Sequence, residues 1–447
     1  MSLPPAEPAT EAVFREMRAR ACEMFRHALA ECSIPRAFSR QIRREGDSLR
    51  VGNDAYDMKS LARMSVVSIG KAGHTMAEAL ANIAGTRLDG IIACPNPPAE
   101  QLPGFRYFTG GHPLPNEASL QAAHAILKLV AGGSARSLVL FLISGGASAI
   151  AEKPIIDSIT LEDVVATYKA LVLSGAPIAE INAIRKHLSA LKGGRLAQAA
   201  APACQASVLV SDVPEKSLDA LASGPTMPDS TTAADCYAIA ERYQLTNAFP
   251  ASVRVLFERK LLDETPKAGD PAFAHSRYAT VLSNVTAINA AVEQAAASGA
   301  FVVEVDNSCD DWDYQRAADH LLQRLRQLRK LSPRACLISG GEVTVKVGAN
   351  SGAGGRNQQF ALHCARRIAG ENITVLSAGT DGIDGNSPAA GAVVDGTTVA
   401  RASQSGFDAA AALEKFDAYP LFDAIGDAIM TSPTGNNVRD LRILLAY

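Results

Sequence analysis

Twelve of the 34 glycines lie in residues 340–396, where they surround side chains that could bind a phosphate group. Glycine lets a backbone turn through positive φ and approach a ligand closely. These glycines flank one cation, Arg356, and two acids, Asp381 and Asp384. A cation and carboxylates among flexible turns suit an anionic, metal-associated ligand, so we predict Asp381 as a metal ligand. The predicted nucleotide- or phosphate-binding residues of this region are Gly354, Gly355 and Asn357.

A second group of candidate residues follows two strand patterns in the first half of the chain. Lys71 begins a helix directly after the strand pattern 64–70, so its ammonium would lie among unpaired backbone amides. The strand pattern 137–144 runs into SGGAS (144–148), whose successive amides can form an anion-binding turn. The predicted phosphate-binding residues of this turn are Ser144, Gly145, Gly146 and Ser148.

Asp212 ends a third strand pattern, in the sequence VLVSDVP. A carboxylate at the end of a strand can hold Mg²⁺ or accept a hydroxyl proton. Asp381, in AGTDG, has the equivalent place in the second half of the chain. Each acid alone is as typical of a helix cap as of catalysis. Two of them with two glycine turns and several cations favour phosphoryl transfer.

Two further segments could bind a small anionic substrate. The helix pattern 178–195 carries Asn182 and Arg185 or Lys186 at helical spacing, which would give one cationic face. The alternative is a basic stripe that faces solvent. His112, in GGHPLPNEAS, is the histidine whose glycine- and proline-rich context favours a loop that faces a ligand.

The elements that would position these side chains alternate between strands and helices. Short apolar runs at 64–70, 90–95, 137–144 and 206–212 are separated by helical patterns, and the alternation restarts at 278–284. This order predicts an α/β fold of two Rossmann-like domains with mostly parallel sheets. We place the domains at residues 1–245 and 246–447. Ligands bind outside the carboxyl ends of parallel strands, so we expect the active site in a cleft between the domains.

The string LISGG occurs twice, at 142–146 and 337–341. Both copies end a strand pattern. The repetition could reflect two related halves, but five residues do not establish a duplication.

Composition describes a globular protein without a nucleic-acid or membrane partner. The chain of 447 residues is 47% hydrophobic and 20% charged, with a formal net charge of −3. It has no basic excess for nucleic acid and no apolar stretch of membrane-spanning length. The eight cysteines form no C-x-x-C pair, and the N-terminus lacks the apolar core of a signal peptide. These features predict reduced thiols in a cytoplasmic protein.

Several nucleotide-enzyme signatures are absent from the sequence. It contains no G-x-x-x-x-G-K-[ST] run, and no G-x-G-x-x-G follows the first strand pattern. The first absence excludes a P-loop enzyme, and the second weakens a nicotinamide-dependent function.

Nine motifs occur in an order that is similar to that of class II glycerate kinases, the glycerate 2-kinase family whose C-terminal part is the MOFRL domain. These motifs are VSIGKAG (67–73), GGHPLPNEAS (110–119), LISGGASA (142–149), INAIRKHLSALKGGRLA (181–197), SDV…SGPTMPD (211–229), LISGGEVTVKV (337–347), GGRNQQF (354–360), AGTDGIDG (378–385) and SPTGNNVRDL (432–441). The resemblance runs from about residue 12 to the C-terminus.

The resemblance implies two α/β domains and phosphorylation of D-glycerate at its 2-hydroxyl by ATP with Mg²⁺. By the same resemblance, Lys71 and Arg356 match the lysine and arginine that act at the transferring phosphoryl group. We assign Asp212 as the third catalytic residue and Asn182, Arg185 and His112 to the substrate. The expected partner is this small molecule, and a homodimer is possible.

The sequence departs from the family pattern at two turns. Glu215 and Lys216 stand where the family has a Gly-Asp pair, and Ala147 stands where members often carry a third glycine. Three alternatives therefore stay open: an NAD(P)H-dependent hydroxypyruvate reductase, a kinase for another short hydroxy acid, and a regulatory protein that binds sugar acids.

Overall fold

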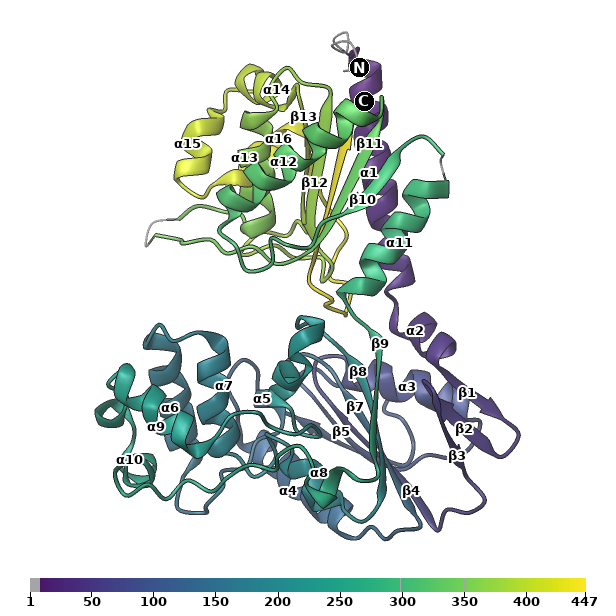
Figure 1. Ribbon diagram of the computed structural model, residues 1–447, viewed down its shortest axis with the longest axis vertical. Coiled ribbons are helices and arrows are strands. Elements are labelled where there is room, and N and C mark those ends of the chain that lie inside the picture. The colour runs from purple at the N-terminus through teal and green to yellow at the C-terminus, as the bar shows by residue number, and fades with distance from the viewer. Residues whose placement is uncertain (1–8, 298, 349–350) are drawn as a thin grey trace. The chain divides into compact units, whose positions relative to one another are not determined.

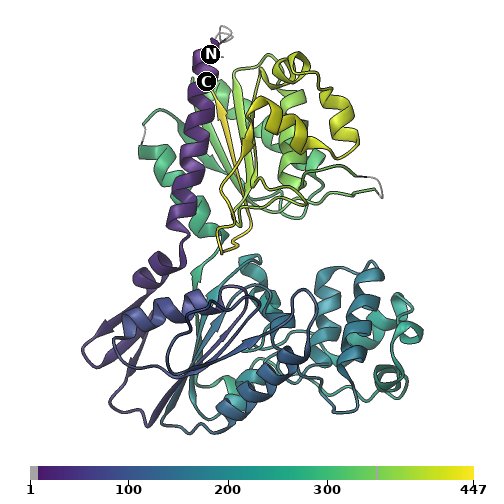
Figure 2. The same ribbon diagram turned by 180° about the vertical axis from the view of Figure 1, so that it is seen from behind.

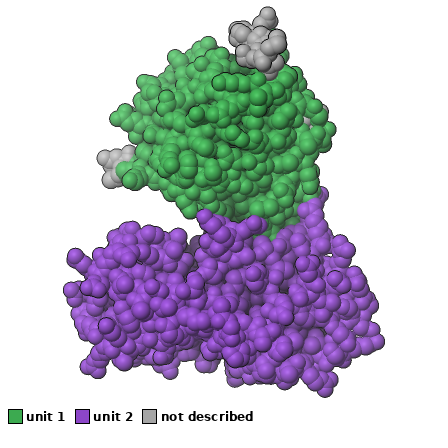
Figure 3. All heavy atoms as spheres, in the orientation of Figure 1, with its two compact units in different colours: residues 1–33, 282–447 green, residues 34–281 purple. Residues whose placement is uncertain are grey.

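The computed structural model describes residues 9–297, 299–348 and 351–447, so part of the predicted glycine-rich run, residues 349–350, lies outside the described residues. The described chain forms two compact units (Figure 3). Unit 2 is Ile34–Val281, and unit 1 combines the chain up to Ser33 with Leu282–Tyr447. Each unit contains a six-stranded sheet.

The main sheet of unit 2 confirms the Rossmann-like prediction (Figure 1). Its ladders from β6 through β8 are all parallel. Numbered from its first strand, the sheet has the order 3-2-1-4-5-6. The strands are β4 (Arg63–Ile69), β5 (Gly90–Cys94), β6 (Phe105–Thr109), β7 (Ser137–Ile143), β8 (Cys204–Val210) and β9 (Ser276–Leu282).

The helices of unit 2 follow the predicted alternation with these strands. Every residue of β7 is buried, which explains why its sequence SLVLFLI is a continuous apolar run. The helix pattern predicted over 178–195 is shorter in the structure: α7 ends at His187, and α8 begins at Arg195 after Gly193 and Gly194, which both have positive φ. The helices are α2 (Ile34–Gln41), α3 (Gly73–Ala84), α4 (Glu117–Ala131), α5 (Ala147–Ile150), α6 (Leu161–Leu173), α7 (Ile178–His187), α8 (Arg195–Ala200), α9 (Ala233–Arg242) and α10 (Ala251–Glu258), with the 3₁₀ segments η1 (Glu215–Ser223), η2 (Thr246–Ala248) and η3 (Pro271–Phe273).

A small antiparallel sheet in unit 2 was not predicted from the sequence. It joins β1 (Ile42–Glu45), β2 (Ser48–Val51) and β3 (Asp54–Asp57) through two short turns. Its strands have four residues each, with few buried side chains, so they lack the apolar run that marks the main sheet.

The sheet of unit 1 is mixed, and the prediction of a mostly parallel sheet is wrong for this unit. Only the ladder between β10 and β11 is parallel among those of its described strands. The reason is the C-terminal strand β15, which inserts between β11 and β12 and runs antiparallel to both. The strands are β10 (Val302–Val305), β11 (Ala335–Gly341), β12 (Ile373–Gly379), β13 (Gly391–Asp395), β14 (Ala428–Ile429) and β15 (Asp440–Ala446).

Helices cover the sheet of unit 1 and bury its apolar residues. Leucines of α12 pack with Phe360 and neighbouring residues of α13 in one core cluster. The helices are α1 (Glu11–Glu31), α11 (Asn284–Ala297), α12 (Tyr314–Leu331), α13 (Arg356–Arg367), α14 (Thr398–Gln404), α15 (Ala409–Glu414) and α16 (Ala418–Ile425).

The first helix, α1, belongs to unit 1 although the sequence placed it with the N-terminal domain. Its buried side chains, including Phe14 and Phe25, join the cluster that contains Ile443 and Leu445 of β15. Figures 1 and 2 show α1 lying along this sheet beside α11. The units therefore divide the chain after Ser33 and Val281, whereas the sequence placed one boundary at residue 245. The apolar face of α1 predicts that this helix packs against a hydrophobic core, but the sequence pattern does not say which unit provides that core.

Among the described residues, no helix is both long enough and apolar enough to cross a lipid bilayer.

Candidate active site

Three strands of unit 2 bring predicted site residues to one edge of its sheet. In the parallel ladders, Ile69 pairs with Ile143, and Ile143 pairs with Leu209. The turns that follow β4, β7 and β8 therefore begin side by side. The strand order reverses between β4 and β7, and ligands of doubly wound sheets bind at such a reversal.

The turns after β4 and β7 are locked together by glycine and by hydrogen bonds. Gly70 has φ +130, and a Cβ there would lie 2.2 Å from Ser144 Oγ, so no larger residue fits. The Lys71 amide donates to Gly145 O at 2.9 Å, and the Ala72 amide donates to Ser144 Oγ at 3.1 Å. Ser144 thus has a structural role, because its contacts fix the backbone position from which the Lys71 side chain extends.

Three side chains lie against the Gly145–Gly146 turn. A Cβ on Gly145 would lie 2.2 Å from Asp212 Oδ2. A Cβ on Gly146 would lie 2.9 Å from His112 Cδ2 and 3.2 Å from Lys71 Cγ. The structure therefore brings together a cation, a carboxylate and an imidazole that the sequence had singled out in separate motifs.

The loop that carries His112 is tied to the start of α4. The Gly111 amide donates to Ser119 Oγ at 2.9 Å, and Asn116 caps the helix by accepting from the Ser119 amide. Partial burial lowers the pKa of His112, and the charge of nearby Lys71 lowers it by a smaller amount. The imidazole is therefore neutral at pH 7 and can accept or donate a hydrogen bond.

The Gly145–Gly146 turn leaves amides available to an anion. Among the residues that the structure describes, the amides of Gly145, Gly146 and Ala147 have no hydrogen-bond acceptor. Lys71 is exposed and forms no ion pair with any described residue. Unpaired amides and an ammonium group on one turn are the chemistry that binds phosphate.

Ser148 and Asn182 belong to a hydrogen-bond chain that extends from this turn. Ser148 Oγ lies 2.8 Å from Ser223 Oγ, and the Ser223 hydroxyl donates to Asn182 Oδ1 at 3.4 Å. Ser223 is buried and has φ +59, which is unusual for a residue with a side chain. This series of hydrogen bonds places Asn182 of α7 close to the Gly145–Gly146 turn.

The other basic residues of the α7 region are occupied by neighbouring side chains. The Arg185 guanidinium stacks on the Tyr168 ring at 4.3 Å. Lys186 is buried between Asp219 (2.9 Å) and Asp229 (3.1 Å), and buried Lys192 pairs with Glu152. Neither lysine is part of a solvent-facing basic stripe, the alternative kept for this helix. Carboxylate binding by Arg185 stays a prediction.

In unit 1, Arg356 begins α13 and is held by two acids. Its Nε donates to Asp440 Oδ2 at 2.7 Å, and its Nη2 lies 2.7 Å from Glu342 Oε1. Burial lowers the pKa of Arg356, but the charges of Asp440 and Glu342 outweigh it and raise the pKa overall. Arg356 is thus a permanent cation whose charge is already offset.

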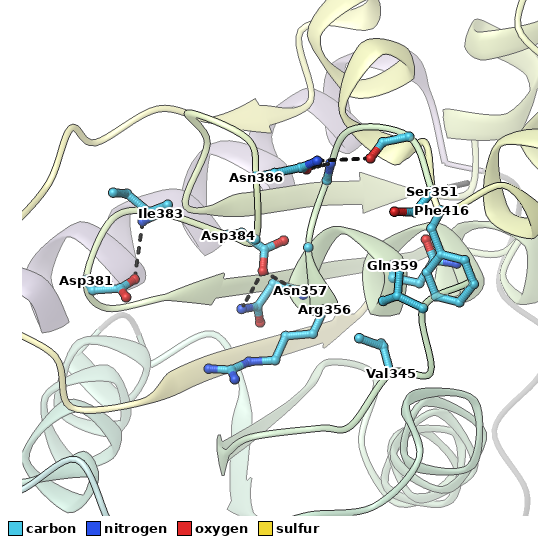
Figure 4. Close-up of a pocket in the computed structure, with 15 residues that line it drawn as sticks. Val345, Ser351, Arg356, Asn357, Gln359, Asp381, Ile383, Asp384, Asn386 and Phe416 are labelled. Carbon is cyan, nitrogen blue, oxygen red and sulfur yellow. Dashed lines mark hydrogen bonds between the residues drawn. The ribbon is translucent and has the colours of Figure 1, made fainter. Parts of the chain in front are cut away.

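Asp384 occupies the N-terminus of α13, next to Arg356 (Figure 4). Its carboxylate accepts from the amides of Asn357 at 3.1 Å and Gln358 at 2.9 Å. A Cβ on Gly355 would lie 2.3 Å from Asp384 Oδ1, so this glycine is required by the carboxylate. Burial raises the pKa of Asp384 to about 6, although the two amides oppose that shift.

The remaining predicted phosphate-binding residues of unit 1 also have internal partners. The Asn357 side chain is buried and accepts from Ser377 Oγ at 2.7 Å. The Gly354 amide donates to Asn386 Oδ1 at 2.8 Å. Phosphate binding by these residues stays a prediction, and the anion that the structure shows at the α13 amides is the protein's own Asp384.

A pocket of about 510 Å³ opens beside these residues in unit 1. Figure 4 shows Asp381 and Ile383 on one side of it and Phe416 with Gln359 on the other. Asp381 Oδ1 accepts from the Ile383 amide at 3.2 Å. The pocket lining includes Arg356, Asp381 and Asp384.

The two predicted metal ligands, Asp212 and Asp381, belong to different units. Within residues 9–297, 299–348 and 351–447, no three His, Cys, Asp or Glu side chains form a metal-binding group. Mg²⁺ usually keeps several waters and takes one or two carboxylates together with phosphate oxygens. The single Asp212 carboxylate at the Gly145–Gly146 turn fits that mode of binding.

The sequence did not single out Ser223, Glu342 or Asp440. Ser223 lies in SGPTMPD and Asp440 in SPTGNNVRDL, two motifs of the family resemblance in which the sequence assigns no role to these residues. Asp440 directly follows Arg439, whose φ of +72 marks a constrained turn. Only the fold brings Asp440 to Arg356, which lies 84 residues earlier.

Comparisons with known proteins agree with this architecture. Residues 20–258 match a family described as a domain of unknown function, DUF4147, and residues 335–440 match the MOFRL family. The D-glycerate 2-kinase of Thermotoga maritima is 35% identical over 391 residues, which cover 86% of this chain and 91% of that protein. A putative hydroxypyruvate reductase of Agrobacterium vitis is 38% identical over 390 residues, with 86% and 87% covered.

A solved structure extends the match to the whole fold. The crystal structure of glycerate kinase from Thermotoga maritima has a TM-score of 0.83 and 32% identity, and the match covers 97% of this chain and 100% of that one. The sequence match and the fold match each cover most of both units. The chain therefore belongs to the glycerate 2-kinase family, in which a DUF4147 segment is followed by a MOFRL segment.

Proposed function

We propose that this protein transfers the γ-phosphoryl group of ATP to the 2-hydroxyl of D-glycerate, which gives 2-phospho-D-glycerate and ADP. The observation that carries the proposal is the group around Gly145–Gly146, where Lys71, His112 and Asp212 meet unpaired amides. Relatives named D-glycerate 2-kinase and glycerate kinase, alike over most of their length, support the same reaction.

Lys71 and the turn amides would stabilise the phosphoryl group in transfer. Phosphoryl transfer requires positioning and charge neutralisation more than covalent chemistry. An ammonium and backbone amides held by the Ser144 contacts supply both without reorganisation.

Asp212 has two candidate roles on the same turn. It could hold Mg²⁺, which would neutralise charge on the phosphate oxygens, or accept the proton of the attacking hydroxyl. Asp381 remains the proposed metal ligand of unit 1. For the glycerate carboxylate and hydroxyls, we propose Asn182, Arg185 and His112, of which Asn182 is supported by its hydrogen-bond chain to Ser148.

Arg356 would act at the phosphoryl group through Nη1, because Nε and Nη2 are held by acids. Such a fixed guanidinium is oriented before the substrate binds, which favours a role in positioning. Gly354, Gly355 and Asn357 would then act by shaping the neighbouring backbone. We also propose a cytoplasmic protein that could form a homodimer.

The second candidate, a hydroxypyruvate reductase, has support in the names of some relatives. Reduction by NAD(P)H needs a dinucleotide site, and the sequence lacks the glycine fingerprint of such a site after its first strand. Phosphorylation of another short hydroxy acid would use the same residues and differs only in the contacts to the acceptor.

Product analysis tests the proposal directly. The protein is incubated with ATP, Mg²⁺ and D-glycerate, and the products are identified by ³¹P NMR. We expect 2-phospho-D-glycerate and one ADP per product molecule. A 3-phospho product would refute the regiochemistry. Oxidation of NADPH by hydroxypyruvate, with no phosphorylated product, would support the reductase instead, and stabilisation by D-glycerate without any product would support a binding protein.

A further inference from the structure

The pocket in unit 1 has the wrong charge for a phosphate group. Its lining carries one cation, Arg356, and two carboxylates, Asp381 and Asp384. Arg356 is already paired with Asp440 and Glu342 outside the lining. The α13 amides, which would otherwise attract an anion, are filled by Asp384. An added phosphate would therefore meet carboxylates without an unpaired cation.

Among glycines and polar residues, the wall of the pocket also carries apolar side chains, one of them aromatic. Val345, Ile383 and Phe416 line it together with the buried amide side chain of Gln359. Its volume of about 510 Å³ lies in the usual range for small-molecule sites, which combine apolar walls with a few polar groups.

Phe416 has a backbone conformation that bulky residues avoid. Its φ is +52, in the left-handed region. The surrounding contacts enforce this turn, since Asp417 Oδ1 accepts from the Ala353 amide at 2.8 Å and Lys415 O accepts from the Gly352 amide at 3.0 Å. A residue in the left-handed region commonly closes a helix, and Phe416 follows the end of α15, where the Asp417 amide donates to Ala412 O at 2.9 Å.

A second set of hydrogen bonds fixes the opposite rim. Asn386 accepts from the Gly354 amide at 2.8 Å and donates to Gly352 O at 3.1 Å. The pocket is thus bounded by backbone that is tied on both sides, and its aromatic wall is formed before any ligand binds.

We propose that this pocket binds the nucleoside part of ATP, with the purine base against Phe416. Bases stack on aromatic side chains. The inference rests on the proposed kinase function, but it changes the expected role of this glycine-rich region from phosphate binding to nucleoside binding.

The test measures the binding of adenosine and the binding of ATP separately in the full-length protein. Adenosine, which has no phosphate, should compete with ATP and bind in equilibrium dialysis. Phe416→Leu removes the ring, so the KM for ATP and the Kd for adenosine should each rise about 10-fold, as expected for one lost stacking contact. The KM for D-glycerate should not change. Phe416→Tyr, which keeps the ring, and Tyr278→Leu, an exposed aromatic of unit 2, should both behave as wild type.

The outcomes separate this inference from the kinase proposal. If no glycerate is phosphorylated but Phe416→Leu weakens adenosine binding, the pocket assignment stands and the kinase proposal fails. Equal adenosine binding by wild type and Phe416→Leu overturns the inference, as does displacement of ATP by tripolyphosphate but not by adenosine. If Phe416→Leu does not fold, the competition between adenosine and ATP on the wild-type protein decides.

Discussion

The two copies of LISGG differ in whether the backbone amides of the turn that they form have hydrogen-bond acceptors. In unit 2, the amides of Gly145 and Gly146 have no acceptor among the described residues. In unit 1, the amide of Gly340 donates to Asn307 Oδ1, that of Gly341 to Asn284 Oδ1, and that of Glu342 to Asp310 Oδ1. The same five residues therefore leave amides without a described acceptor in one unit and form a closed structural turn in the other.

The cations beside the glycine-rich turns differ in the same way. Lys71 is exposed and lies against Gly146 without an ion pair to any described residue. Arg356 is held by Asp440 and Glu342 beside a helix start that Asp384 fills. A glycine turn with a nearby cation therefore indicates an anion site only if the amides of the turn and the cation are not already bound by side chains of the protein.

Lys71→Ala should cause the largest change in activity and almost none in stability. Loss of a cation at a transferring phosphoryl group should lower kcat/KM about 10⁴-fold, equivalent to about 5 kcal/mol. Because Lys71 has no ion pair to any residue that the structure describes, the melting temperature of Lys71→Ala should match that of wild type. Lys59→Ala, at a lysine whose side chain is 74% exposed, is the control and should keep full activity. Near-normal turnover by Lys71→Ala would remove Lys71 from the mechanism.

Arg356→Ala should differ by losing stability as well as activity. It leaves Asp440, whose side chain is 1% exposed, with Arg442 at 3.5 Å as its remaining ion-pair partner among the described residues. Because Arg356 is 34% exposed and Arg442 stays in place, the loss should be below that of a fully buried pair, about 2 kcal/mol. Denaturant unfolding measures this loss. Arg367→Ala, at an exposed arginine of the same helix, should change stability by less than about 1 kcal/mol. The double variant Arg356→Ala, Asp440→Asn should recover part of the loss, and its failure to do so would contradict the pairing.

Asp384→Asn should change how stability depends on pH. Since the folded-state pKa of about 6 lies above the ordinary value, the folded protein binds this proton more tightly. The contribution of Asp384 to stability therefore falls as pH rises from about 4 to about 6. Relative to wild type, Asp384→Asn should gain up to about 3 kcal/mol across this window.

The matched control for this effect is Asp408→Asn, which changes an exposed cap of α15. An equal pH dependence in both variants would show that burial at the α13 N-terminus is not the cause.

The sequence predicted β4, β5, β7 and β8 of unit 2 and the residues of its open turn, because both are local features; it did not predict β6 or the small β1–β3 sheet. A buried apolar run followed by Gly70 or Gly145 defines a strand and its turn without knowledge of distant residues. The family resemblance added the reaction. Lys71, His112 and Asp212 were each found separately, and only the parallel register brings them together.

The features of unit 1 that were not predicted depend on partners far apart in the sequence. β15 enters the sheet of unit 1 between strands that precede it by many residues. Asp384 caps a helix that begins at Arg356, and Asp440 reaches the same arginine from the last strand. Arg18 of α1 pairs with Asp395, which ties the N-terminal helix to unit 1. Local sequence patterns show that these residues are polar, but they do not predict which side chain or amide each residue contacts.

Glycine amides provide the most direct test of the difference between the two turns. The protein is labelled with ¹⁵N-glycine, and ¹H–¹⁵N correlation spectra are recorded as inorganic phosphate is added. We predict saturable shifts of the Gly145 and Gly146 amides, which are absent in Lys71→Ala, and no comparable shift of Gly340 or Gly341. Phosphate-dependent shifts at Gly340 and Gly341 with none at Gly145 and Gly146 would contradict the assignment of the open turn as the phosphate site.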